Sequence, residues 1–176
     1  AVFAVPALSE DGKYGHFTKD KFNVTILSNA WRSMQEEGLI TKEEFINTTF
    51  QFYCRKLTEI EAPLRDEGSP VYKAGLRIVS ARTKVITCPS YHEWISSGLQ
   101  ETTETRLLYA RSYVLNLRVW CEHALLSGLS EERDMKERKE IVNEVFKRVE
   151  EKAVKHPEQS ITILYIAYVH LMKKPV

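Results

Sequence analysis

Residues 161–172, ITILYIAYVHLM, decide the fold of this chain. Nearly all of them are apolar, five of the twelve are β-branched, and apolar side chains occupy both parities of the alternation. Successive side chains of a strand point to opposite faces of a sheet, so this pattern predicts a central strand buried on both faces. Twelve residues are too few to cross a membrane as a helix. A buried helix is the alternative, and periodicity alone does not exclude it.

A central strand needs a neighbour on each edge and helices over both faces. Residues 1–8, AVFAVPAL, and residues 71–87 predict those two neighbours. The middle of the second segment alternates between a face expected to be covered, with Val79, Ala81, Thr83 and Val85, and a wet face with Ser80, Arg82 and Lys84. A last strand that returns between two earlier ones runs antiparallel to both.

Composition sets the class of protein. The chain has 176 residues, 43% of them hydrophobic and 28% charged, as expected for one soluble globular domain or part of one. A net charge of +1 gives no overall field that would favour nucleic acid or an anionic membrane. Three cysteines without CxxC spacing favour reduced thiols and a cytoplasmic location.

About six helices complete the expected structure. A helical period predicts three longer helices, at residues 22–37, 104–127 and 131–155. Capping boxes predict three short helices, beginning at Thr41, Thr58 and Ser90. The helix at 104–127 carries a wide apolar stripe, made by Leu108, Leu115, Val119 and Leu126. The run of charges that opens the last helix predicts a solvated surface.

Several motifs carry a resemblance to a known family. Residues 27–40, LSNAWRSMQEEGLI, resemble a signature of the SABATH methyltransferases, the salicylate, jasmonate and caffeine-type enzymes. Tyr53 falls on that family's aromatic residue, and Glu59 falls on its helix-opening glutamate. Residues 145–148 and 168–174 resemble its Val/Leu-Phe-x-Arg helix and its final strand. The resemblance covers nearly the whole chain, but only about the C-terminal half of such an enzyme.

The resemblance implies an α/β fold, with part of a class I methyltransferase sheet. Residues 1–8, 71–87 and 161–172 would be its fifth, sixth and seventh strands, with the last one central and antiparallel. The three strands would be covered by about six helices. Residues 1–176 would then be a single domain, the C-terminal part of the fold. Residues of about 38–70 and 88–130 would form a helical substrate cap.

The implied reaction moves a methyl group from S-adenosylmethionine to a small-molecule carboxylate or ring nitrogen. By residue match, Val24, Tyr53 and Leu115 would line the substrate pocket, and plain core positions are the alternative for each. The family's Gly-rich cofactor loop and acidic ribose-binding residue lie upstream of the matching region. No GxGxxG occurs in this chain. Its residues are therefore expected to contribute little to binding the cofactor, and none is assigned a catalytic role.

Two interpretations of function remain open. In the first, the chain acts with a missing N-terminal half, or with a homodimer partner along the first strand, because that strand would otherwise expose an apolar edge. In the second, it is a non-catalytic module that holds a small hydrophobic ligand or a protein partner. The histidines show no metal-ligand spacing, so no metal site is expected.

Overall fold

The computed structural model describes residues 1–12, 25–49, 53–96, 98, 102–161 and 163–174. They belong to two compact units, each described by itself below. The first unit is Ala1–Phe22, Tyr53–Cys88 and Thr162–Val176, and the second is Asn23–Phe52 and Pro89–Ile161. The predicted single domain with a helical cap at about 38–70 and 88–130 stays a prediction.

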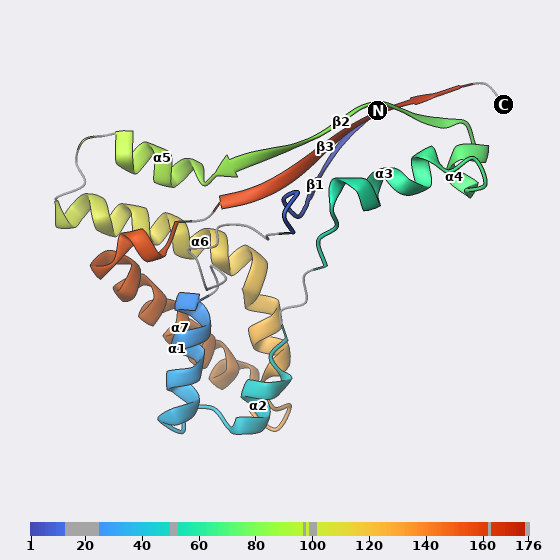
Figure 1. The fold of residues 1–176 in the computed structure, drawn as a ribbon. Coiled ribbons are helices and arrows are strands. Elements are labelled where there is room, and N and C mark those ends of the chain that lie inside the picture. The colour runs from blue at the N-terminus through green and yellow to red at the C-terminus, as the bar shows by residue number, and fades with distance from the viewer. Residues whose placement is uncertain (13–24, 50–52, 97, 99–101, 162, 175–176) are drawn as a thin grey trace. The chain divides into compact units, whose positions relative to one another are not determined.

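The first unit contains a three-stranded sheet (Figure 1). Its strands are β1 (Val2–Pro6), β2 (Leu76–Thr87) and β3 (Ile163–Lys173), in the order β1-β3-β2. Both pairings are antiparallel, and β2 and β3 stay paired along their whole length. The prediction that the last strand is central and reversed relative to both neighbours is confirmed.

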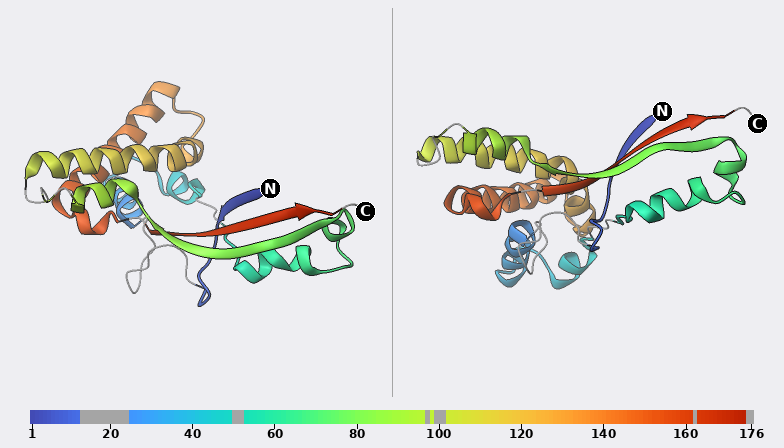
Figure 2. Two further views of the ribbon diagram at one scale, coloured as in Figure 1. Left: turned by 90° about the horizontal axis from the view of Figure 1, so that it is seen from above. Right: turned by 45° about the horizontal axis from the view of Figure 1, so that its top comes forward.

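One face of this sheet is covered in part, although Val85 on it is 58% exposed, and the other face is open. Helix α3 (Leu57–Arg65) packs against β2, as the views in Figure 2 show. Ala167 and Val169 share one face of β3, and both are completely buried. On the opposite face Leu164 is 37% exposed and Met172 is 47% exposed. The prediction that β3 is buried on both faces is therefore wrong. The sequence shows that a strand is apolar, but it does not show how many layers cover it.

The strand predicted from residue 71 begins later. Ser69 Oγ accepts a hydrogen bond of 3.1 Å from Tyr72 N, and Pro70 is the first helical residue. This N-cap starts a short helix, α4 (Pro70–Lys73), so β2 begins only at Leu76. A β-bulge follows between Ile78 and Ser80. It leaves Val79 exposed rather than on the covered face, because a bulge shifts the alternation by one residue.

The outer edge of β1 has few partners. Ala7 forms a parallel bridge with Arg55, and Leu8 N donates a hydrogen bond of 3.0 Å to Arg55 O. Within the described residues no strand pairs with this edge from Val2 to Pro6. Whether a homodimer partner or another segment pairs there stays a prediction.

The second unit is helical. It holds α1 (Thr25–Glu36), α2 (Lys42–Asn47), α5 (Pro89–Ser96), α6 (Thr103–Gly128), α7 (Met135–Lys155) and a short 3₁₀-helix, η1 (Pro157–Gln159). Helix α7 packs against both α6 and α1. The side chains buried most completely between these helices are Leu27, Met34, Ile40, Leu125, Val142, Val145, Phe146 and Val149.

Helix α6 turns a different face to the core than its sequence suggested. The buried residues are Tyr109, Ala110, Tyr113, Val114, Cys121 and Leu125. At 100° per residue these six lie opposite the stripe of Leu108, Leu115 and Val119, which points to solvent. Apolar residues occur on both sides of this helix, so periodicity could not select the buried one.

Seven α-helices occur in the described residues, against about six predicted. Across the parts of the chain that the structure describes, none of these helices combines the length and the apolar character needed to cross a bilayer. The architecture is α/β in general terms, with one small antiparallel sheet and a separate helical unit.

Candidate functional site

The structure describes two of the three residues predicted to line a substrate pocket. Tyr53 is 78% exposed, and the guanidinium carbon of Arg55 lies 5.5 Å from its ring centroid. Leu115 is 65% exposed on α6. Val24 lies outside the described residues. Tyr53 and Leu115 belong to different compact units. Their role in substrate binding therefore stays a prediction.

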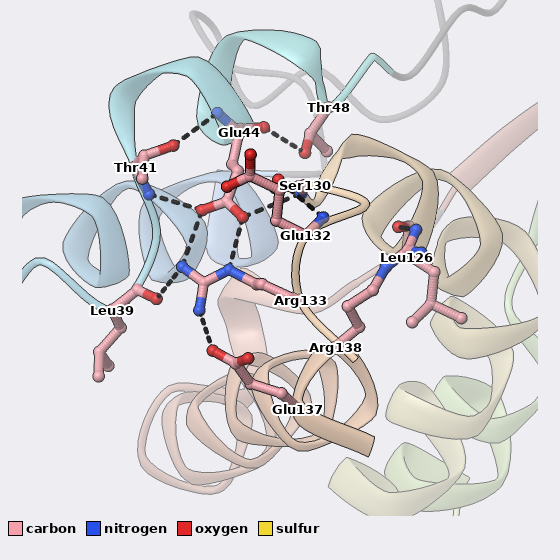
Figure 3. A network of polar contacts seen from close by, with 10 residues as sticks. All are labelled: Leu39, Thr41, Glu44, Thr48, Leu126, Ser130, Glu132, Arg133, Glu137 and Arg138. Carbon is pink, nitrogen blue, oxygen red and sulfur yellow. Dashed lines mark hydrogen bonds and ion pairs between the residues drawn. The ribbon is translucent and has the colours of Figure 1, made fainter. Parts of the chain in front are cut away.

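The most developed polar site in the second unit is built on Glu44, near the start of α2 (Figure 3). Thr41 N donates a hydrogen bond of 2.7 Å to Glu44 Oε2, and Glu44 N donates one of 3.1 Å to Thr41 Oγ1. This reciprocal pair is the capping box predicted from the sequence, and it is confirmed. It fixes the Glu44 carboxylate at a defined position beside the helix terminus.

The same carboxylate also holds the loop before α7. Ser130 N donates a hydrogen bond of 3.0 Å to Glu44 Oε1. Arg133 donates from Nε to Oε1 at 2.6 Å and from Nη2 to Oε2 at 3.0 Å. Arg133 Nη2 also reaches Leu39 O at 3.3 Å, and its Nη1 donates to Glu137. Figure 3 shows the guanidinium lying between these acceptors.

These contacts determine the charge of Glu44. Its side chain is only 3% exposed, and burial by itself raises the pKa of the carboxyl. The hydrogen bonds from Arg133, Thr41 and Ser130 outweigh burial and lower the pKa to about 2. The carboxylate therefore stays ionised near neutral pH and accepts four hydrogen bonds. A group held in this way is suited to fastening two loops together, not to transferring a proton.

Sequence reasoning found half of this site. The capping box identified Glu44, but the charged run that contains Arg133 was expected to be solvated on all sides. Arg133 instead turns toward Glu44 and is only 21% exposed. A single sequence carries no signal for this pairing, because 89 residues separate the two partners.

A second polar link joins α1 to α7. Arg148 Nη1 and Nη2 donate to the two oxygens of Glu37 at 2.6 and 2.7 Å, and Arg148 Nε donates to Glu144 at 2.9 Å. The Arg148 hydrogen bonds hold the pKa of the Glu37 carboxyl below its usual value. This pair also fastens helices together rather than forming a reactive centre.

An aromatic cluster fastens α5 to α6. The rings of Trp94 and Tyr109 stack with their centroids 5.0 Å apart, and Tyr91 meets Tyr109 edge-on at 6.1 Å. Tyr109 OH donates a hydrogen bond of 3.2 Å to the carbonyl of the buried Ser160. The cluster therefore connects Ser160, which follows η1, to both α5 and α6. Its aromatic side chains pack against one another.

The buried cysteine of α6 is not an activated nucleophile. Cys54, Cys88 and Cys121 are all free thiols. Burial raises the pKa of Cys121 to about 11, so its reactive thiolate form is scarce at neutral pH. In the residues that the structure describes, no group of three or more His, Cys, Asp or Glu side chains could hold a metal ion.

The described residues contain no glycine-rich turn from a strand into a helix, the feature with which the resembled family binds S-adenosylmethionine. That mode needs a glycine-rich turn between a strand and a helix, so that backbone can approach the ligand. Strand β2 passes into α5 through Cys88 alone, with no glycine at the junction. No GxGxxG occurs in the sequence. We therefore assign no reaction step to the cofactor on this chain.

No protein-family model matches the chain, and no curated protein matches it.

Proposed function

We propose that this chain is the substrate-capping portion of a SABATH-like, S-adenosylmethionine-dependent methyltransferase that acts on a small-molecule carboxylate or ring nitrogen. The order of the sheet is the main support. β3 lies between β1 and β2 and runs antiparallel to both, as expected for the seventh strand between the fifth and sixth. The motifs at 27–40 and 145–148 support the same assignment.

In this proposal the chain provides walls, not reactive groups. Methyl transfer to a carboxylate needs no general base, because the nucleophile is already ionised, and catalysis then depends on alignment and on excluding water. Exposed apolar side chains such as Leu115 can serve this purpose only after another part of the enzyme covers them. Activity therefore requires a cofactor-binding portion joined to this chain.

The test is methyl transfer by the longer polypeptide, or by this chain mixed with a cofactor-binding portion. Labelled S-adenosylmethionine and a panel of small aromatic and aliphatic acids would be supplied, and methyl esters would be measured. Leu115→Asp should lower turnover, whereas Ile46→Asp, at an exposed site on α2, should not. Lack of ester formation across the panel, with S-adenosylhomocysteine bound normally, would exclude a carboxylate acceptor. Lack of N-methylation of a matching panel of nitrogen heterocycles as well would contradict the proposal.

A second experiment examines the chain alone. Calorimetric titration with S-adenosylhomocysteine should give no heat of binding, because the chain has no cofactor loop. Tight binding would mean that the chain holds the cofactor by another route. It would therefore overturn the division of labour proposed here.

A non-catalytic binding module is the second candidate. The observation that favours it is the outward stripe on α6, where Leu115 and the 86%-exposed Val119 present apolar surface to solvent. Such a module would hold a small hydrophobic ligand or a protein partner. A stable 20.4 kDa monomer that binds no cofactor in its native source would support this second function over the first.

A further inference from the structure

The strand register of the first unit defines a second surface, which we name the open sheet face. In the ladder, Ala4 pairs with Tyr168 and Arg82 pairs with Tyr168 from the other side. Residues paired in this way point to the same face. We define the open sheet face by twelve of these residues: Val2, Ala4 and Pro6 on β1, Ser80, Arg82, Lys84 and Ile86 on β2, and Leu164, Ile166, Tyr168, His170 and Met172 on β3. Arg77 pairs with Met172 beyond the bulge, but its guanidinium lies over the ring of Tyr72, and it is not counted among the twelve.

Most of the open sheet face is apolar, and much of it is in contact with water. Eight of its twelve side chains are Val, Ala, Pro, Ile, Leu, Tyr or Met. All three of its residues on β1 are exposed, as are Leu164 and Met172 on β3. Ile166 and Tyr168, in the middle of β3, are only partly covered. A sheet of this kind gains stability when a second layer removes its apolar face from water.

The charged side chains of the open sheet face are all basic. Arg82 and Lys84 are two residues apart on β2 and both are exposed, as is His170 on β3. None of the twelve residues is acidic. Lys84 Nζ lies 6.0 Å from the ring centroid of Tyr168, and neither Arg82 nor Lys84 forms an ion pair with any described residue. The face therefore has an apolar centre and an uncompensated basic margin along β2.

We infer that the open sheet face docks an amphipathic α-helix of a protein partner, with Asp or Glu along the side of its apolar stripe that lies over β2. A helix is the usual second layer on a sheet, and an acidic flank would pair with Arg82 and Lys84. A second copy of the chain would bring like charges together. A lipid surface is recognised by larger clusters of Lys and Arg than this face carries. The inference does not depend on methyl transfer.

The test uses the chain as it stands and a designed peptide. The probe is a fluorescent amphipathic helix of about 18 residues, roughly 27 Å long, with a Leu/Ala stripe flanked by Glu. Two matched probes carry Lys in place of Glu, or the same composition in scrambled order. Fluorescence anisotropy should show that the Glu-flanked peptide binds about tenfold more tightly than the Lys-flanked one. The scrambled peptide should bind less tightly than either.

Substitutions on the open sheet face test whether the peptide binds there. The double variant Arg82→Glu/Lys84→Glu should reverse the preference between the two flanked peptides without loss of fold, since both side chains are exposed. Ile166→Asp should weaken all binding at least tenfold. Ile46→Asp, at an exposed apolar site on α2, should change nothing. Circular dichroism would confirm that each variant is folded, and hydrogen exchange should show protection in β1 and β3.

Several results would overturn the inference. One is equal binding of the Glu- and Lys-flanked peptides, and another is unchanged preference in the charge-reversed variant. A dimer that disappears in Ile166→Asp, measured by sedimentation equilibrium, would assign the face to a second copy. Sedimentation of the chain with vesicles of phosphatidylcholine and phosphatidylserine, lost in the charge-reversed variant, would assign it to a membrane.

Discussion

Arg133 and Glu44 form a two-point ion pair across the second unit, with N–O distances of 2.6 and 3.0 Å. The pair joins the start of α2 to the loop before α7, and Ser130 N adds a third hydrogen bond from the same loop. Because the carboxylate is buried, its charge is acceptable only while these donors stay in place. The pair is therefore a sensitive point for the stability of the helical unit.

Removal of the arginine should be costly. Arg133→Ala leaves a buried carboxylate without its main partner and should lower the free energy of unfolding by about 3 kcal/mol. Urea denaturation followed by circular dichroism at pH 7 would measure it. Lys136→Ala is the matched control, because its pair with Glu140 spans 3.9 Å in solvent and should contribute less than about 1 kcal/mol. Equal effects of the two substitutions would contradict a special role for Arg133.

The same pair predicts a dependence of stability on pH. The folded pKa of Glu44 is about 2, below the ordinary value of 4.5, so the folded state binds the proton less readily than the unfolded state. Its contribution should be fully present above pH 4.5 and should be lost as pH falls toward 2. The difference in unfolding free energy between the original chain and Glu44→Gln should therefore shrink over that window. A constant difference would show that Glu44 ionisation is not involved.

Gly128 should not tolerate a side chain. A Cβ built there would lie 2.8 Å from the Cα of Thr48, so the end of α6 and the C-cap of α2 would have to move apart. Gly128→Ala should destabilise the chain by about 1–3 kcal/mol, although alanine is the better helix former. Ser127→Ala, at the exposed neighbouring position, should be close to neutral or slightly stabilising. Thermal unfolding of the two variants would show the contrast.

The three thiols should differ in reactivity. Cys121 is buried among the core residues of α6, and its pKa is raised to about 11, whereas Cys54 and Cys88 are partly exposed. In the folded chain a thiol reagent at pH 8 should modify Cys121 last, and only at the rate of unfolding. Mass spectrometry of timed samples would identify the order. Early modification of Cys121 would show that α6 opens more easily than its packing indicates.

The sequence predicted the sheet well because its signals are local and strong. The apolar, β-branched run at 161–172 predicts a central strand, and the chain has two further strand patterns to pair with it. A last strand that returns between two earlier ones runs antiparallel to both, as β3 does. Whether helices cover one face of β3 or both was not predictable in the same way. A second layer depends on what lies against the sheet, and residues such as Leu164 and Met172 look alike whether or not a helix covers them.

Helix α6 shows that an element can be predicted from sequence while its buried face cannot. Its length and ends were predicted within a residue or so, but its buried face was not. Apolar residues occur on both sides, and Tyr113 lies in the core between the helices while Leu115 is exposed. The candidate site divides in the same way. The capping box at Thr41 follows from four adjacent residues, whereas the partner Arg133 is set by tertiary packing.

The position of β3 has a consequence for biosynthesis. Among the described residues, β1 and β2 share no hydrogen bonds with each other, and within the sheet each pairs only with β3. A ribosome releases β3 after both of them and after the whole helical unit, so the nascent sheet strands must wait, unpaired and apolar, for their common partner. Pairing that spans such long separations in sequence forms slowly. Chaperone binding during translation should therefore concentrate on β1 and β2 rather than on the helices.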